Sequence, residues 1–151
     1  MEIAVNLPPS DWYVETEQNR LWWWGLDYPP LSAYWAWITG KAAQRLNPAW
    51  VALFDSRRNE SLRLKWFMRA TVILADLLIW IPALMIYTKH RSYSWVMRLW
   101  MLLSPTMLLV DHGHFQYNNV MLGFLVCAVV LVLDWRRPVL ATASIIMSAG
   151  F

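Results

Sequence analysis

The stretch ATVILADLLIWIPALMIY, from Ala70 to Tyr87, decides the fold class, because it is apolar over almost the length of a membrane-spanning helix. A helix needs roughly 20 residues to cross the hydrocarbon of a bilayer. Only Asp76 and Pro82 interrupt the run. The sequence therefore predicts a first transmembrane helix over about 70–87.

Further apolar runs follow, and they predict three more membrane helices, over about 96–111, 119–134 and 138–151, the last one truncated. The composition agrees, since 58% of the residues are hydrophobic and twelve are Trp, which concentrates where lipid meets water. A net charge of +3 is too small to indicate nucleic-acid binding. We expect an all-α, polytopic membrane protein that is a fragment of a longer chain.

Residues 1–69 differ from the rest and predict a loop outside the membrane. Residues 1–28 are polar and contain prolines, while the range 30–46 predicts a helix bounded by proline at each end. Its apolar residues recur every three or four positions, at Leu31, Tyr34, Trp35, Ile38 and Ala42. The spacing fits an amphipathic helix on the membrane surface and fits an ordinary half-buried helix equally well.

Positive charge predicts the orientation of the helices. Lys and Arg lie in the loops after the first and third predicted spans, whereas the loop from Asp111 to Asn118 has none. These loops predict that residues 1–69 and the Asp111 loop are lumenal, although the basic segment 55–69 argues the other way. The glycosylation sequon at Asn59 favours the lumenal side weakly. In either orientation both distinctive polar clusters share one face.

The first of these clusters is WWWGLDYPP, from Trp22 to Pro30. Aromatic side chains stack on the C–H faces of sugars, and a carboxylate beside them can act as a general base. Asp27 is therefore a candidate base. From spacing alone, a cap for the helix that begins at Pro29 or Pro30 is the more favoured role for this residue.

The second cluster is DHGHFQYN, from Asp111 to Asn118. His112 and His114 could bind a metal together with Asp111, but no further strong ligand stands at a characteristic spacing. The imidazole and amide groups could instead hold a phosphate or sugar hydroxyls, aided by a helix that starts near Asn118. A polar loop that satisfies its own hydrogen bonds is an equal alternative. Asp76, within a span, fits either a functional role or a packing contact.

Several motifs together resemble a known family. They are Trp24 to Leu31, Asn47 to Trp50, Phe67 to Arg69, Ala75 to Ile79 and Gly113 to Asn118, and they resemble the dolichyl-phosphate-glucose-dependent glucosyltransferases of the endoplasmic reticulum. The resemblance covers nearly the whole chain. The branch that adds the first glucose to the nine-mannose, dolichol-linked oligosaccharide fits better than the branch that adds the second.

This resemblance implies a GT-C fold with a lumenal first loop, in the endoplasmic reticulum membrane, and an inverting transfer that forms an α-1,3 link. It assigns Asp27 as the general base, in place of the cap. Substrate contacts fall to aromatic, amide and imidazole groups of the two clusters: Trp24, Tyr28, Asp111, His112, His114, Gln116, Tyr117 and Asn118. It implies no metal or other cofactor, since dolichyl-phosphate-glucose is the donor substrate. We expect a monomer at full length.

The chain departs from the family pattern in ways that limit these expectations. A preceding membrane helix and later phosphate-binding helices are missing, and His112 stands where a tyrosine is common. We therefore expect the chain to be inactive alone. A non-catalytic membrane protein derived from the enzyme is the alternative, and for it Asp27→Asn would leave any cellular phenotype untouched. A transporter segment is disfavoured, because the polar clusters lie at one membrane face rather than at mid-span.

Overall fold

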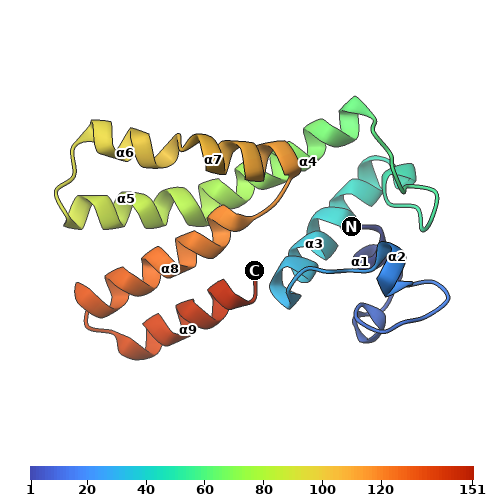
Figure 1. Cartoon of the computed structure of the whole chain (residues 1–151), viewed down its shortest axis with the longest axis horizontal. Helices are drawn as coiled ribbons and strands as arrows, with labels where there is room; N and C mark the ends of the chain where they lie inside the picture. Colours follow the sequence, from blue (N-terminus) through green and yellow to red (C-terminus); the bar gives the residue numbers. More distant parts are fainter. The chain divides into compact units, whose positions relative to one another are not determined.

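The computed structural model describes all 151 residues and contains helices and turns but no strand, which confirms the all-α prediction. The chain divides into two compact units, residues 1–67 and residues 68–151. Each unit is described by itself below, and Figure 1 labels the helices in chain order.

The first unit is built on the packing of helix α1 (Glu2–Asn6) against helix α3 (Pro30–Leu46). The two helices approach closely at Gly40, where an added Cβ would clash with the Val5 side chain. Small residues therefore line the buried face of α3. The buried side chains of this unit form two clusters, made of Ile3, Ala4, Leu7, Trp12, Leu26 and Ala33 and of Val5, Ala43 and Val51.

This packing changes the expectation for residues 1–28 and leaves both alternatives for the helix over 30–46 open. Residues 1–28, expected to be a polar loop, contain α1, the short helix α2 (Leu21–Trp24) and the fully buried Trp12. On α3, the apolar stripe noted in the sequence does not face the core: Tyr34 and Ile38 are exposed, while Ala33 and Ala43 are buried. The reason is steric, since only small side chains fit beneath α1. Helix α3 is thus half-buried and carries an apolar outer face.

A 29-residue helix, Leu62–His90, leads into the second unit and is the one helix long and apolar enough to cross a membrane, judged by length and composition. It comprises α4 (Leu62–Ala75), a π-helical turn (Asp76–Trp80) and α5 (Ile81–His90). The predicted first span, 70–87, lies inside this helix.

The second predicted span is interrupted in the structure. Helix α6 (Trp95–Leu102) ends before Ser104, and α7 (Pro105–Met107) continues into a second π-helical segment, Leu108–Gly113. Pro105 explains the break, because the residue before a proline is disfavoured in the helical conformation. The single helix expected over 96–111 is therefore wrong in detail.

Helices α8 (Asn118–Leu133) and α9 (Pro138–Ala149) are shorter apolar helices that pack as a pair, seen side by side in Figure 1. Small and hydroxyl residues of α9 make the contact: Ser144 donates to the Phe124 carbonyl at 2.7 Å and Ser148 to the Met121 carbonyl at 3.0 Å. Such residues are typical of helix interfaces in membranes. That α8 and α9 cross a bilayer stays a prediction.

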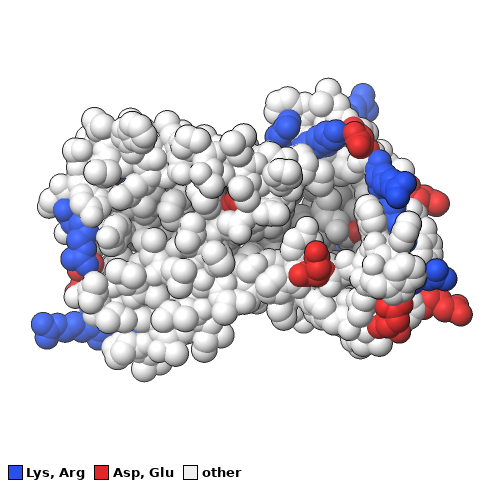
Figure 2. Space-filling view, viewed as in Figure 1, with Lys and Arg blue, Asp and Glu red and all other residues white.

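Charged groups of the second unit gather where α5 and α8 end. Arg91 pairs with Asp134 at 3.4 Å, and the ring of His90 lies 6.2 Å from that of Trp135. Figure 2 shows Lys and Arg at that end of the unit beside a broad uncharged surface. The segment Asp111–Asn118 lies at the opposite end of α8, and its side of the membrane stays a prediction.

Candidate functional site

The loop that carries Asp27 has contacts with the first unit on both sides. Before it, the side chain of Leu26 is buried in the core of the first unit. After it, the Tyr13 hydroxyl donates to the Tyr28 carbonyl at 2.7 Å. Gly25 lies two residues before Asp27 and packs closely on the Leu21 backbone. A Cβ added there would lie 2.5 Å from the Leu21 Cα, so only glycine fits without movement of the backbone. The backbone around Asp27 is therefore well fixed.

The carboxylate of Asp27 is exposed, and no hydrogen bond or ion pair ties it to the rest of the chain. Helix α3 begins at Pro30 with Pro29 at its cap position, and no side chain caps it. The helix-cap role that spacing favoured is therefore wrong. A carboxylate that is fixed in place and has no partner within the chain is free to accept a proton from a substrate.

Aromatic side chains flank Asp27 on both sides in the sequence. Trp24 and Tyr28 are both exposed. Partial burial raises the pKa of the Tyr28 phenol, and the negative charge of Asp27 adds to that rise. Tyr28 therefore stays protonated at neutral pH, and its hydroxyl can donate a hydrogen bond beside the carboxylate.

In the second cluster, Asp111 forms several hydrogen bonds within the fold. Its fully buried carboxylate accepts the backbone N–H of Asn118 at 3.2 Å and of Asn119 at 2.7 Å. The Asn118 side chain donates to the same carboxylate at 2.9 Å. Asp111 thus occupies the positive end of α8, which the sequence had offered to a phosphate.

A buried polar network joins this cluster to the long helix. The Asp76 carboxylate lies 3.0 Å from His112 Nε2 and accepts the Asn119 amide at 3.1 Å. Both hydrogen-bond partners of Asp76 thus lie within this chain, so its packing contact does not require a neighbouring helix from elsewhere. The Asn119 carbonyl oxygen is buried and has no hydrogen-bond partner. Sequence reasoning missed Asn119, although an amide in the first turn of an apolar helix is a signal for such a contact.

Arg69 and Thr71, near the start of the second unit, hold the middle of the cluster. The Arg69 side chain donates to the His112 carbonyl at 3.4 Å and stacks over the Phe115 ring at 5.7 Å. The hydroxyls of Thr71 and Tyr117 lie 2.9 Å apart. These contacts fix the segment on α4, and neither Arg69 nor Thr71 was among the predicted site residues.

Among the predicted site residues of the second cluster, His114 and Gln116 are exposed. The Gln116 carbonyl accepts from the Asn118 amide at 3.0 Å, which leaves its own amide group free to donate outward. The structure thus brings the six predicted residues of this cluster into one segment at the start of α8. It divides them into side chains used inside the protein and side chains that face out. Asp27, Trp24 and Tyr28 belong to the other unit.

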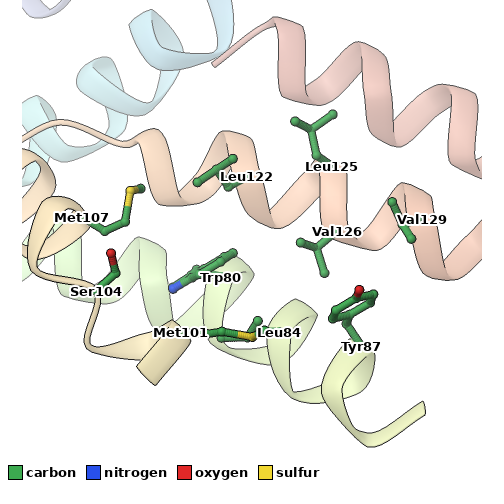
Figure 3. A pocket seen from close by; sticks show the side chains of 10 residues that line it. All are labelled: Trp80, Leu84, Tyr87, Met101, Ser104, Met107, Leu122, Leu125, Val126 and Val129. Atoms are coloured by element: carbon green, nitrogen blue, oxygen red, sulfur yellow. The ribbon is translucent and has the colours of Figure 1, made fainter. Parts of the chain in front are cut away.

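An apolar cavity of about 440 Å³ lies elsewhere in the second unit, among α5, α6 and α8. Figure 3 shows its lining, in which Ser104, Tyr87 and the Trp80 indole supply the few polar atoms. It holds no carboxylate or imidazole, so it offers no general base. No group of three or more His, Cys, Asp or Glu residues is placed to hold a metal ion in the chain.

Taken together, an all-α fold, a long apolar helix and a solvent-facing carboxylate flanked in the sequence by exposed aromatic residues are typical of a membrane protein that handles a polar substrate. The sequence of residues 1–149 matches the ALG6, ALG8 glycosyltransferase family. The chain therefore belongs to this family.

Similar proteins carry a common name. The chain is 48% identical over 143 residues to a dolichyl pyrophosphate Man9GlcNAc2 alpha-1,3-glucosyltransferase of Gallus gallus, covering 89% of the chain and 28% of that protein. It is 43% identical to the protein of the same name from Mus musculus, covering 99% and 30%. A probable member from Dictyostelium discoideum is 40% identical, covering 100% and 30%. The chain thus spans less than a third of these relatives.

Proposed function

We propose that this chain forms part of an inverting glucosyltransferase of the endoplasmic reticulum membrane. The enzyme moves glucose from dolichyl-phosphate-glucose to the mannose-terminated, dolichol-linked oligosaccharide and forms an α-1,3 link. It adds the first glucose, on the lumenal face, as a monomer and without a metal or other cofactor. The observation that carries the proposal is the exposed and unpartnered carboxylate of Asp27, which stands in the sequence between the exposed aromatic residues Trp24 and Tyr28.

In this reaction Asp27 removes the proton from the acceptor hydroxyl of mannose. The freed oxygen attacks the anomeric carbon of glucose, the bond from that carbon to the phosphate oxygen breaks, and dolichyl phosphate leaves with the electron pair. Attack from the side opposite the phosphate inverts the configuration from β to α. One carboxylate suffices, because the phosphate leaves as a stabilised anion and needs no proton.

The remaining candidate residues take different roles in this proposal. Trp24 and Tyr28 contact the sugars beside Asp27, and His114 and Gln116 offer outward-facing groups to a substrate. Asp111, Asn118, His112 and Tyr117 act through their contacts within the chain, by holding the segment in shape. Since Asp111 occupies the end of α8, the leaving phosphate is stabilised by side chains rather than by that helix end.

A chimera tests the proposal in a complete enzyme. The matching segment of the Gallus gallus relative is replaced by this chain, and the product is expressed in cells that lack the enzyme. We expect the chimera to restore glucosylation of the lipid-linked oligosaccharide and its Asp27→Asn variant to fail at equal expression. Asp55→Asn is the matched control, because Asp55 is exposed in the same unit.

Equal rescue by the Asp27→Asn variant would remove Asp27 from catalysis. No rescue by the unmodified chimera at normal expression would favour the non-catalytic alternative. The 151-residue chain alone, given both substrates in detergent, should show no turnover, because the chain is less than a third of its relatives' length. Turnover by the isolated chain would show that it contains every catalytic group.

A further inference from the structure

A cavity of about 460 Å³ lies within the first unit and is not explained by the reaction proposed for Asp27. It is lined by two Trp, two Arg, one Phe and one Glu: Trp22, Trp23, Arg20, Arg57, Phe54 and Glu17. Its size is within the range of small-molecule sites in proteins. Trp22 and Trp23 belong to the first cluster noted in the sequence, but none of the six lining residues was individually predicted to contact a substrate.

Arg57 is the most firmly held of the charged groups. Its Nε donates to the Glu2 carboxylate at 2.8 Å, and its guanidinium lies 4.7 Å from the centre of the Phe54 ring. One terminal nitrogen, Nη2, is buried and has no hydrogen-bond partner. A buried donor without a partner costs free energy in the free protein.

The two tryptophans form the walls of the cavity and face solvent. Trp22 is 74% exposed and Trp23 is 57% exposed. Their rings meet at 72°, with centres 6.1 Å apart, so they present two differently oriented planes. Large aromatic surfaces left in water at a cavity indicate a binding site, and such planes suit the C–H faces of pyranose rings.

Phe54 adds a backbone feature. Its φ of 70° lies in the left-handed region, which a bulky residue rarely adopts. Conformations of this kind persist where the surrounding structure imposes them, and they concentrate at functional sites. The Phe54 ring lines the cavity next to the Arg57 guanidinium.

The mixture of charges narrows the class of ligand. Two arginines alone would suit a phosphate, but Glu17 in the same lining repels an anion and accepts hydrogen bonds from hydroxyls. The charged lining also argues against insertion of this surface into lipid. A neutral molecule with apolar faces and many hydroxyls fits both the rings and the charged groups.

We infer that this cavity binds mannose residues of the acceptor oligosaccharide, away from the hydroxyl that reacts at Asp27. The inference rests on the proposed function, since that function supplies a mannose-rich acceptor. The cavity positions the acceptor and takes no part in proton transfer. Loss of its contacts therefore weakens acceptor binding and leaves the chemical step in place.

Binding of the free Man9GlcNAc2 glycan, without lipid or diphosphate, tests the inference directly. The 151-residue chain in detergent is titrated with the glycan, and binding is followed by saturation-transfer NMR. We expect Trp22→Ala, Trp23→Ala and Arg57→Gln each to weaken binding tenfold or more. Trp100→Ala is the matched control, because Trp100 is equally exposed but lies in the second unit.

Kinetics of the chimera provide the second measurement. Trp22→Ala should raise the KM for the lipid-linked acceptor at least fivefold with kcat within twofold, whereas Asp27→Asn should lower kcat. Unchanged glycan binding and unchanged KM in the cavity variants would overturn the inference while Asp27 kept its role. Inorganic diphosphate that displaces the glycan would overturn it in favour of an anion site. Quenching of Trp22 and Trp23 by brominated phosphatidylcholine, with no glycan effect, would overturn it in favour of lipid contact.

Discussion

The two units differ in whether the carboxylates of their distinctive clusters are exposed or are buried and hydrogen-bonded. In the first unit, Asp27 stands in solvent on a fixed loop and has no partner. In the second, Asp111 and Asp76 are buried, and each accepts hydrogen bonds from neighbouring side chains or backbone. A carboxylate occupied by the protein builds structure, while an unoccupied one is available for a substrate. Composition made the two clusters look alike, and hydrogen bonding separates them.

The largest effect expected from this comparison concerns activity. In the chimera, Asp27→Asn should lower glucosyl transfer by about 10²–10⁴-fold, the usual contribution of a general base. The same change should leave thermal stability almost untouched, since an exposed side chain without partners contributes within about 0.5 kcal/mol. Transfer assays and a melting curve on one preparation give both numbers. A large fall in melting temperature would show that the carboxylate has a structural role after all.

The second effect concerns the buried carboxylate, whose removal should lower stability rather than activity alone. Asp111→Ala should destabilise the chain by about 2–4 kcal/mol, because it removes a helix cap and leaves buried N–H groups without acceptors. Thermal unfolding followed by circular dichroism in detergent measures the change, with Asp55→Ala as an exposed control. If both variants melt together, the buried network does not stabilise the fold.

A matched pair of glycine substitutions sharpens the comparison further. Gly25→Ala should cost roughly 1–3 kcal/mol and displace the Asp27 loop, because its Cβ meets the Leu21 backbone at 2.5 Å. Gly113→Ala should be tolerated, since no atom lies within 4 Å of the added Cβ. Melting curves and transfer assays on the two chimeras compare them. Equal tolerance would mean that the loop before Asp27 is freer than its contacts indicate.

The smallest effect is electrostatic. Burial raises the pKa of Tyr28 and the charge of Asp27 raises it further, so Asp27→Asn should shift that pKa back toward its ordinary value. NMR of ring-labelled tyrosine, assigned with Tyr28→Phe, follows the titration. The folded chain binds this proton more tightly than the unfolded chain, so stability from Tyr28 is lost as pH rises above about 10. A Tyr28 pKa unchanged by Asp27→Asn would place the carboxylate away from the phenol.

The sequence predicted some features well, for reasons that can be stated. Apolar runs and their flanking prolines indicated helices over most of 30–46, 119–134 and 138–151, because local pattern dominates there. The break at Ser104 depended on one proline inside an apolar run, whose effect on a helix varies with its surroundings. The buried face of α3 could not be predicted, since the small residues that face α1 matter only once the two helices meet.

The candidate site shows the same limit. Residue types and order pointed to both clusters, but could not say which side chains were already in use by the fold. The caps of α3 and α8 illustrate it: spacing offered Asp27 as a cap, and the structure leaves α3 without one and caps α8 with Asp111. Asp111 lies seven and eight residues before the backbone N–H groups whose hydrogen bonds it accepts. Such a cap requires a loop that folds back on the helix, and the spacing rules for helix caps do not predict it.

The π-helical turn at Asp76–Trp80 restricts the insertions and deletions that this helix can tolerate in evolution. A π turn contains about one residue more than an α-helical turn, so it rotates everything after it by about 100° relative to everything before it. Removal of a single residue here would turn the face that α5 presents to α8 toward another direction, although every side chain of α5 stayed the same. Gly123 of α8 packs against this turn, where a Cβ would meet the Trp80 backbone at 3.2 Å. Insertions and deletions in this segment would therefore have to preserve the rotation of α5 about its own axis, more than the identity of any one side chain.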